Sequence, residues 1–311
     1  MNLTRHILIS TIASLSVVIL ALLFQLKKAS APAARSVVLT EKKSAVESGS
    51  PTPHLVRQLL RNELLLEEQI EAVRALPSDL SPEEFDSLFQ IIKEPAPATV
   101  NAARWYTLQN EIMEVLRDSR FHWSQYPVEM AALMADRNVD PVVRDYSAQH
   151  LALYLGDRSH EVEQTVIDPV MESYLALLQG EREAFEQVTG TAMMALCDLS
   201  SKRPELVEPY RDSLEAIFLS IASQERPATL ANQISAIQAS GRMGFVSLLP
   251  VVRELAKDPS SNPSIQLSSV AALGYFADSA DKPFLLELAQ SSQRVRFAAA
   301  AALKNYSVTT D

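Results

Sequence analysis

A repeated helical pattern constrains the fold of this chain more than any other feature of its sequence. The segments IQLSSVAALGYF (265–276) and VRFAAAAALKNY (295–306) align at an offset of 30 residues, with most apolar and small positions in common. An earlier segment, ISAIQASG (234–241), aligns with residues 267–274 at an offset of 33 residues. A unit of ~30–40 residues that contains two helices is typical of a solenoid, in which each unit packs on the next.

A more distant copy of the pattern lies earlier in the chain. Residues 140–151 align with residues 292–303, so that Arg144 matches Arg296. Alanines in these segments predict that the second helix of each helix pair approaches the next second helix closely, because a methyl side chain takes little room. Leucines are expected to fill the space between the pairs: Leu273, Leu285, Leu286, Leu288 and Leu303.

Proline-containing signals predict where several helices begin. Ser81-Pro82-Glu83-Glu84 combines a capping box with proline at the first helical position, and Asp140-Pro141 and Asn262-Pro263 each place an N-cap residue before proline. No segment shows the sustained alternation of apolar and polar residues that marks a strand. Glycine is also scarce, at 7 of 311 residues, which leaves little material for tight hairpins or phosphate-binding loops. We therefore predict an all-α fold without a sheet.

The pattern V-R-x-x-A-x-x-A-L, followed by a turn and L-L-x-L-A, resembles HEAT repeats, especially the HEAT-like repeats of bilin-lyase-related proteins. Its clearest copies are residues 140–155 and 233–306, roughly a third of the chain. Gln266 replaces the arginine of the pattern in one copy, and Lys304 replaces the glycine of the turn in the last copy. The resemblance implies an α-solenoid of stacked antiparallel helix pairs over residues 54–311, and it indicates the fold better than the function.

The first residues of the sequence predict a membrane anchor. Residues 7–26 are uncharged and mostly apolar, and they suffice for a helix of ~30 Å, the thickness of the hydrocarbon core of a bilayer. We expect residues 1–28 to form a single transmembrane helix, with Ile7–Leu26 in the lipid bilayer. The alternative is a cleaved signal peptide, because Ala31-Pro32-Ala33 offers a small-residue cleavage site. The repeat protein would then be secreted.

Residues 29–53 are rich in alanine, serine and proline, and we expect them to be a flexible linker to the repeat domain. Two features disagree on the side of the membrane that this domain occupies. The excess of lysine and arginine after residue 26 favours the cytoplasm by the positive-inside rule. A short basic start before an apolar run is, in contrast, typical of an export signal. We expect the extracytoplasmic side.

Charge is divided unevenly between the first 53 residues and the expected repeat domain. Residues 1–53 carry six basic and two acidic side chains, a net charge of +4, whereas residues 54–311 carry 22 basic and 36 acidic side chains, a net charge of −14. A domain this acidic is repelled by phosphate backbones, so we expect no nucleic-acid partner and no DNA-repair glycosylase of the HEAT-like type. The basic part suits an anionic membrane surface.

No motif in the sequence supports an enzyme. His160-Glu161-Val162-Glu163-Gln164 has glutamine where the zinc motif H-E-x-x-H needs its second histidine. The single cysteine, Cys197, lies in an apolar stripe and His150 lies among leucines, so we expect both to be packed in the core. One cysteine excludes an internal disulfide, and the nucleotide-binding and hydrolase motifs are absent. We predict no catalytic residue, no metal site and no cofactor.

The expected function is that of a scaffold or adaptor that binds protein partners. The extended surface of a solenoid is its natural contact area, and we place the contact on non-core positions of the second helices. Because the domain is acidic, we expect a neutral or basic partner. The alternative is a lyase-type enzyme of the bilin-lyase class that the repeats resemble. The candidate partner-binding residues are Arg144, Gln149, Gln266, Arg296 and Lys304.

The expected anchor leads to a direct prediction. The full chain should stay in the membrane pellet after washing with alkaline carbonate. The double substitution Val18→Arg and Leu20→Arg should release it, because each arginine at the centre of a spanning helix costs ~2.5–3.5 kcal/mol. Recovery of a soluble protein that begins at Ala34 would show instead that the segment is a cleaved signal peptide.

Overall fold

The computed structural model describes residues 65–120, 124–159, 162–180, 186–291 and 294–306. All described residues belong to one compact unit. The expected anchor (1–28) and linker (29–53) lie outside the described residues. Within the described ranges, no helix combines the length and the apolar character needed to cross a membrane.

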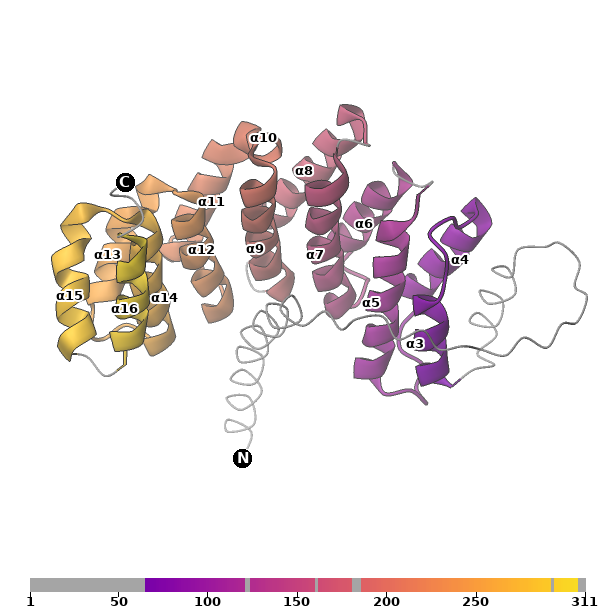
Figure 1. The fold of residues 1–311 in the computed structure, drawn as a ribbon, viewed down its shortest axis with the longest axis horizontal. Coiled ribbons are helices and arrows are strands. Elements are labelled where there is room, and N and C mark those ends of the chain that lie inside the picture. Colours follow the sequence, from indigo (N-terminus) through magenta and orange to yellow (C-terminus); the bar gives the residue numbers. More distant parts are fainter. Residues whose placement is uncertain (1–64, 121–123, 160–161, 181–185, 292–293, 307–311) are drawn as a thin grey trace, which may run out of the picture. The chain divides into compact units, whose positions relative to one another are not determined.

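Antiparallel helix pairs follow one another along the described chain, which contains no strand (Figure 1). Within the described residues, helix α3 (Leu66–Arg74) precedes the pairs. The first helices of the pairs are α4 (Pro82–Lys93), α6 (Gln125–Ala135), α8 (Gln164–Gln179), α11 (Arg211–Ala222), α13 (Leu249–Lys257) and α15 (Lys282–Ser291). The second helices are α5 (Ala102–Asp118), α7 (Pro141–Arg158), α9 (Gln187–Lys202), α12 (Leu230–Met243), α14 (Pro263–Phe276) and α16 (Arg296–Asn305). Short helices lie in the connections between pairs: α10 (Pro204–Val207), η3 (Glu208–Tyr210), η4 (Val246–Leu248) and η5 (Ser279–Asp281).

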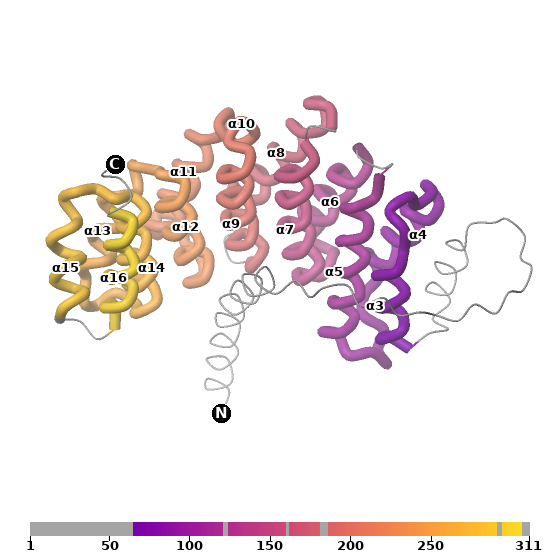
Figure 2. The backbone as a smooth tube through the Cα atoms, viewed as in Figure 1, coloured from indigo at the N-terminus to yellow at the C-terminus, as the bar shows by residue number. Residues whose placement is uncertain are grey.

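The two kinds of helix form two layers (Figure 2). Helices α3, α5, α7, α9, α12, α14 and α16 lie side by side in chain order, each in contact with the next. Most of the first helices lie behind them as a second layer, in which α8 contacts both α6 and α11, whereas α15 lies at the end of the row beside α16. One hydrophobic core runs between the layers and includes buried side chains of every pair. Each pair therefore buries its apolar face against its neighbours, as in other repeat proteins. The all-α, solenoid-like fold expected from the sequence is thus confirmed.

Local side-chain chemistry sets the helix starts that the sequence predicts. Ser81 Oγ accepts a hydrogen bond from the backbone N–H of Glu84 at 3.3 Å, and Glu84 Oε2 accepts one from the N–H of Ser81 at 2.8 Å. Asp140 and Asn262 each accept, through Oδ1, the backbone N–H two residues further on, both at 2.9 Å. Helices α4, α7 and α14 therefore begin at the predicted prolines.

Small residues allow adjacent second helices to approach closely, as predicted. A Cβ atom added to Gly241 of α12 would lie 3.0 Å from the carbonyl oxygen of Ala272 in α14. A Cβ atom added to Gly274 of α14 would lie only 2.5 Å from Cα of Ala302 in α16, closer than real Cβ atoms come to their neighbours. Helices α14 and α16 can therefore keep their separation only with glycine at position 274. The equivalent position in α16 is Lys304, which is exposed.

The leucines expected between the pairs differ in burial. Leu273 and Leu285 are fully buried, and Leu288 and Leu303 pack against the core while partly exposed. Leu286 is 44% exposed, so the expectation that it fills the space between pairs is wrong. Leu285 already points into the core from α15. Leu286 points toward solvent, because consecutive residues of a helix point about 100° apart.

The close approach of α14 and α16 predicts the effect of a single methyl group. Gly274→Ala should lower the free energy of unfolding by about 1–3 kcal/mol, because overpacking forces the two helices apart. Urea unfolding of the full chain in a mild detergent, followed by circular dichroism, measures the change.

Gly156→Ala in α7 is the matched control. Its added Cβ atom would meet only side-chain atoms of Lys202 and Leu199, the nearest being the flexible Lys202 Cδ at 3.0 Å. This variant should be neutral or gain up to about 1 kcal/mol from the better helix propensity of alanine. Equal unfolding midpoints for the two variants would contradict the packing argument.

Candidate functional site

The outer face of the second helices forms one continuous surface. We define the second-helix surface as the solvent-facing side of α7, α9, α12, α14 and α16. In α14, for example, Leu267, Ala271 and Tyr275 recur at helical spacing on this side, and none of them is buried. The main residues of the surface, in chain order, are Gln149, Leu153, Met194, Asp198, Ile234, Gln238, Arg242, Leu267, Tyr275 and Phe297.

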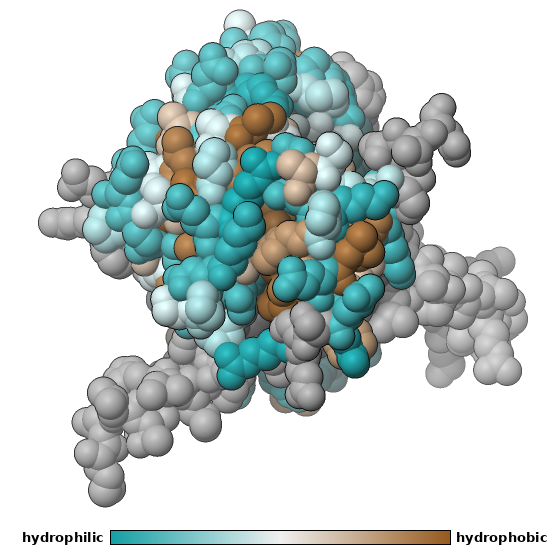
Figure 3. Space-filling view, turned by 90° about the vertical axis from the view of Figure 1, so that its left-hand side faces the viewer, coloured by the Kyte–Doolittle hydropathy of each residue, from teal (hydrophilic) through white to brown (hydrophobic). Residues whose placement is uncertain are grey.

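Three large apolar side chains on this surface are open to solvent. Leu267 is 44% exposed, Tyr275 53% and Phe297 71%. Leu267 and Phe297 occupy equivalent positions of the aligned repeats, on the adjacent helices α14 and α16. Figure 3 views the end of the domain that carries α15 and α16, and it shows apolar side chains in patches between hydrophilic ones. The sequence reasoning missed these residues as contact candidates, because the same positions also fit the apolar pattern of a core helix.

Three of the five candidate partner-binding residues are exposed: Gln149, Arg296 and Lys304. Gln149 lies in the second-helix surface on α7. Arg296 begins α16, and its guanidinium carbon lies 4.6 Å from the centroid of the Phe297 ring, which is a cation–π contact. Lys304 stands at the repeat position that Gly274 occupies in α14. The candidates that remain outside the core therefore lie on the first and last helices of the surface.

Arg144 is buried, which corrects the expectation that it contacts a partner. Only 2% of the residue is exposed. Its Nε donates to the carbonyl oxygen of Met134, near the end of α6, at 2.9 Å, and its Nη1 forms an ion pair with Glu186, the N-cap residue of α9. Arg144 therefore ties the end of its own first helix to the start of the next second helix. A buried charge needs such pairing, because an unpaired one is strongly destabilising.

Gln266, which replaces this arginine in α14, makes the first of the two bonds. Its Nε2 donates to the carbonyl oxygen of Ala256, near the end of α13, at 3.3 Å. Gln233 of α12 donates in the same way to Ala222 of α11 at 2.8 Å. These side chains satisfy carbonyl groups that the end of a helix leaves without a backbone partner. Gln266 is half-buried and bonded within its own helix pair, so the structure gives it a role in helix packing.

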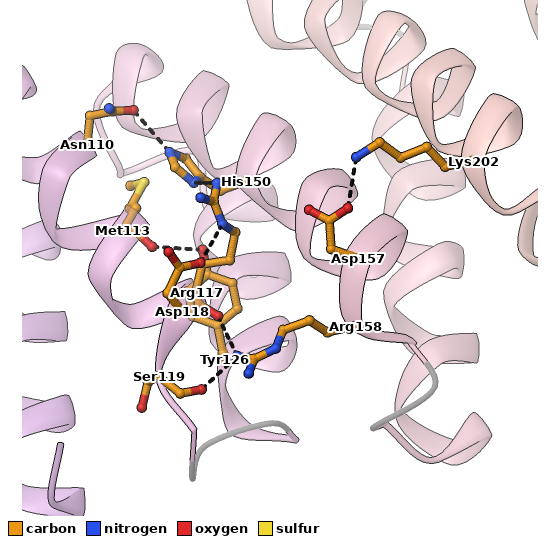
Figure 4. A network of polar contacts seen from close by, with 10 residues as sticks. All are labelled: Asn110, Met113, Arg117, Asp118, Ser119, Tyr126, His150, Asp157, Arg158 and Lys202. Atoms are coloured by element: carbon orange, nitrogen blue, oxygen red, sulfur yellow. Dashed lines mark hydrogen bonds and ion pairs between the residues drawn. The ribbon is translucent and has the colours of Figure 1, made fainter. Parts of the chain in front are cut away.

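Polar contacts join α5 to α7 beneath the surface (Figure 4). His150 is buried; its Nε2 lies 3.0 Å from Oδ1 of Asn110, and its Nδ1 lies 3.3 Å from Nη1 of Arg117. Burial, and after it the positive charge of Arg117, lowers the pKa of His150 to about 3. Arg158 donates to the carbonyl oxygens of Arg117 and Ser119 at 3.0 and 2.8 Å. His150 is thus packed in the core, as predicted, and is neutral near pH 7.

A buried carboxyl group lies at the junction of α7 and α9. Asp145 Oδ2 accepts a hydrogen bond from Nε2 of Gln187 at 2.7 Å. Burial raises the pKa of Asp145 to about 6, although hydrogen bonds from Thr191 and Gln187 and the charge of Arg144 act in the opposite direction. Asp145 therefore exchanges its proton in the mildly acidic range.

Ion pairs join successive second helices. Lys202 Nζ of α9 lies 2.9 Å from Oδ1 of Asp157 in α7, and Arg242 Nη2 of α12 lies 2.5 Å from Oδ1 of Asp198 in α9. The carboxylates of both pairs are exposed, so each pair contributes only ~0.2–1 kcal/mol to stability. Their greater effect is on the local charge of the surface, because Lys202 and Arg242 are each neutralised by a neighbouring aspartate.

Cys197 lacks the properties of a catalytic thiol. It is fully buried in α9, and burial raises the pKa of its thiol to about 11, so the thiol is protonated near neutral pH. His160 and Glu161 of the incomplete zinc motif lie outside the described residues. Gln164, at the start of α8, donates to Asp168 at 2.7 Å. In the described ranges, no three His, Cys, Asp or Glu side chains are grouped so that they could hold a metal ion.

Comparison with family models supports repeats in one part of the chain, residues 215–304. Residues 215–304, which include helices α12 to α15 and most of α16, match the family model for HEAT repeats. The structure of human deoxyhypusine hydroxylase in complex with glycerol aligns with 83% of this chain and 96% of its own chain, at 15% sequence identity and a TM-score of 0.34. No curated protein matches this chain. The resemblance to HEAT repeats is thus confirmed for the last helix pairs.

Asp145 and His150, both in α7, change the stability of the folded chain with pH in opposite directions. The pKa of Asp145, about 6, lies above its ordinary value of 3.8, so the folded chain holds this proton more tightly and gains stability as the pH falls from 6 to 4. The pKa of His150, about 3, lies below its ordinary value of 6.5, so the folded chain loses stability as the pH falls over the same range. Each slope is about 1.4 kcal/mol per pH unit at most.

Substitution of each residue should separate the two effects. Asp145→Asn should make the chain lose stability more steeply between pH 6 and pH 4, and His150→Gln should make the loss shallower. Urea unfolding of the full chain at several pH values in this range measures both slopes relative to the parent. Parallel curves for the parent and both variants would show that these two groups do not titrate as described.

Proposed function

We propose that this protein is a membrane-tethered scaffold or adaptor that binds a protein partner through the second-helix surface. The observation that carries the proposal is the continuity of this surface. Residues as distant in the sequence as Gln149 and Phe297 lie in one layer, because α7, α9, α12, α14 and α16 contact one another in order. A partner segment that crosses the layer can therefore touch several helix pairs at once.

Exposed apolar side chains favour this surface over the opposite one. Leu267, Tyr275 and Phe297 lie on two adjacent helices, and exposed apolar residues gathered on one face mark interaction sites. Aromatic side chains are also prominent among the residues that dominate binding energies. The first-helix layer exposes Val128 and Leu286, but these lie far apart in the chain of pairs, on α6 and α15.

The membrane tether belongs to the same proposal. The apolar residues 7–26 would hold the repeats near a bilayer through the linker 29–53, on the extracytoplasmic side. Tethering raises the effective concentration of a partner in the same membrane, so a modest intrinsic affinity of the surface suffices. The net charge of −14 on residues 54–311 argues against nucleic acid as the partner.

Site-specific photo-crosslinking tests the proposal in the intact chain. A photoreactive phenylalanine analogue at Gln149, Tyr275 or Phe297 should form adducts with one and the same polypeptide, identified by mass spectrometry after purification from membranes. The matched controls are Glu172 of α8 and Leu286 of α15, which are exposed on the first-helix layer. Adducts at the control positions alone, or at none of the positions, would rule the second-helix surface out as the contact site.

A further inference from the structure

One end of the second-helix surface differs in charge from the rest of the domain. Helices α12, α14 and α16 contain no aspartate or glutamate. Their charged residues are Arg242, Arg296 and Lys304, and the exposed Arg294 lies just before α16. The domain as a whole, residues 54–311, carries a net charge of −14. This end of the surface is therefore a basic region on an acidic domain.

Four acidic side chains near these helices are engaged with other groups: Asp198, Asp258, Asp278 and Asp281. Arg242 is balanced by Asp198 of α9, so the excess positive charge lies toward α16. In the connection before α15, Asp278 and Asp281 pair with Arg253 at 2.7 and 2.8 Å. In the connection before α14, Asp258 accepts hydrogen bonds from Ser260 and Ser261, at 2.7 Å from the Ser260 hydroxyl. No acidic residue of the three helices themselves faces Arg294 and Arg296, because these helices have none.

Exposed apolar side chains lie on the same helices as these cations. Leu267 and Phe297 occupy equivalent positions on neighbouring helices, and packed helices lie ~8–10 Å apart. A bound peptide in the polyproline II conformation has three residues per turn and advances ~3.1 Å per residue. Its side chains three residues apart therefore lie on one side, ~9 Å apart, and would reach successive helices. Arg296 lies directly over the Phe297 ring, so an apolar contact and a charged contact are available at the same place.

We propose that this end of the surface, on α12, α14 and α16, binds an acidic segment of the partner protein that carries apolar side chains about three residues apart. The inference rests on the proposed function and specifies the chemistry of the partner. It reverses the expectation of a neutral or basic partner, because the local charge of the contact surface, and not the net charge of the domain, decides electrostatic complementarity. Binding should weaken as the salt concentration rises.

An unbiased peptide selection tests the charge of the preferred ligand. Random dodecapeptides displayed on phage are selected on the full chain in mild detergent, after removal of phage that bind the Leu267→Ser/Phe297→Ser variant. Both substituted residues are at least 44% exposed, so the variant should keep its fold, which circular dichroism verifies. Enriched peptides should carry net negative charge together with several apolar residues.

Charge reversal then tests the named arginines with an enriched peptide made synthetically. Arg294→Glu/Arg296→Glu should weaken its binding about tenfold, measured by fluorescence anisotropy. The control is Lys257→Glu/Lys282→Glu, which changes the net charge equally at exposed positions of the first-helix layer and should leave the affinity unchanged.

The possible outcomes separate this inference from the proposed function. Enrichment of neutral or basic peptides would overturn the inference while leaving the second-helix surface as a protein-binding site. Failure to enrich any peptide would overturn both.

Discussion

The close approach of adjacent second helices is the constraint on which the rest of the structure depends. A Cβ atom at Gly274 would clash with Ala302, and one at Gly241 would lie in tight contact with Ala272. Interaxial distances between helices depend on the side chains at the contact, and small ones permit the shortest. Because the second helices are held so close, their outer sides join into one surface. The contact between α7 and α9 likewise brings the start of α9 within reach of Arg144 in α7, so this polar contact between pairs depends on the packing of the second helices.

Much of the fold could be predicted because it depends on short-range chemistry. The helix starts at Ser81, Asp140 and Asn262 need only a side chain and a backbone N–H two or three residues away. The repeat offsets placed Gly241 and Gly274 at equivalent positions, and equivalent positions of a repeat meet equivalent neighbours. The all-α architecture required no more than these local signals and the helical spacing of apolar residues.

The candidate site could be predicted only in part, because burial depends on neighbours in space. Arg144 and Arg296 match in the sequence alignment, yet Arg144 is buried and Arg296 is exposed. Arg144 is paired by Glu186, which belongs to the following helix pair, and the described chain has no pair after α16 to supply such a residue. Phe297 likewise fits the apolar pattern of a helix whether its side chain is buried by a neighbouring helix or exposed to solvent, so the pattern alone could not predict its exposure. A surface assembled from several helices also has no single motif by which a sequence could reveal it.

Lys304 has a consequence for contacts between molecules. Gly241 of α12 and Gly274 of α14 lie against the next second helix. The equivalent residue of α16, Lys304, has a long, charged side chain that is exposed. A helix pair of a second molecule could continue the stack at the same spacing only by burying this ammonium group, and the burial of a charged group is costly. Head-to-tail contacts that do not close into a ring generate filaments. One lysine therefore opposes the end-to-end growth of the repeats into fibres, much as charged residues protect the edge strands of β-sheets.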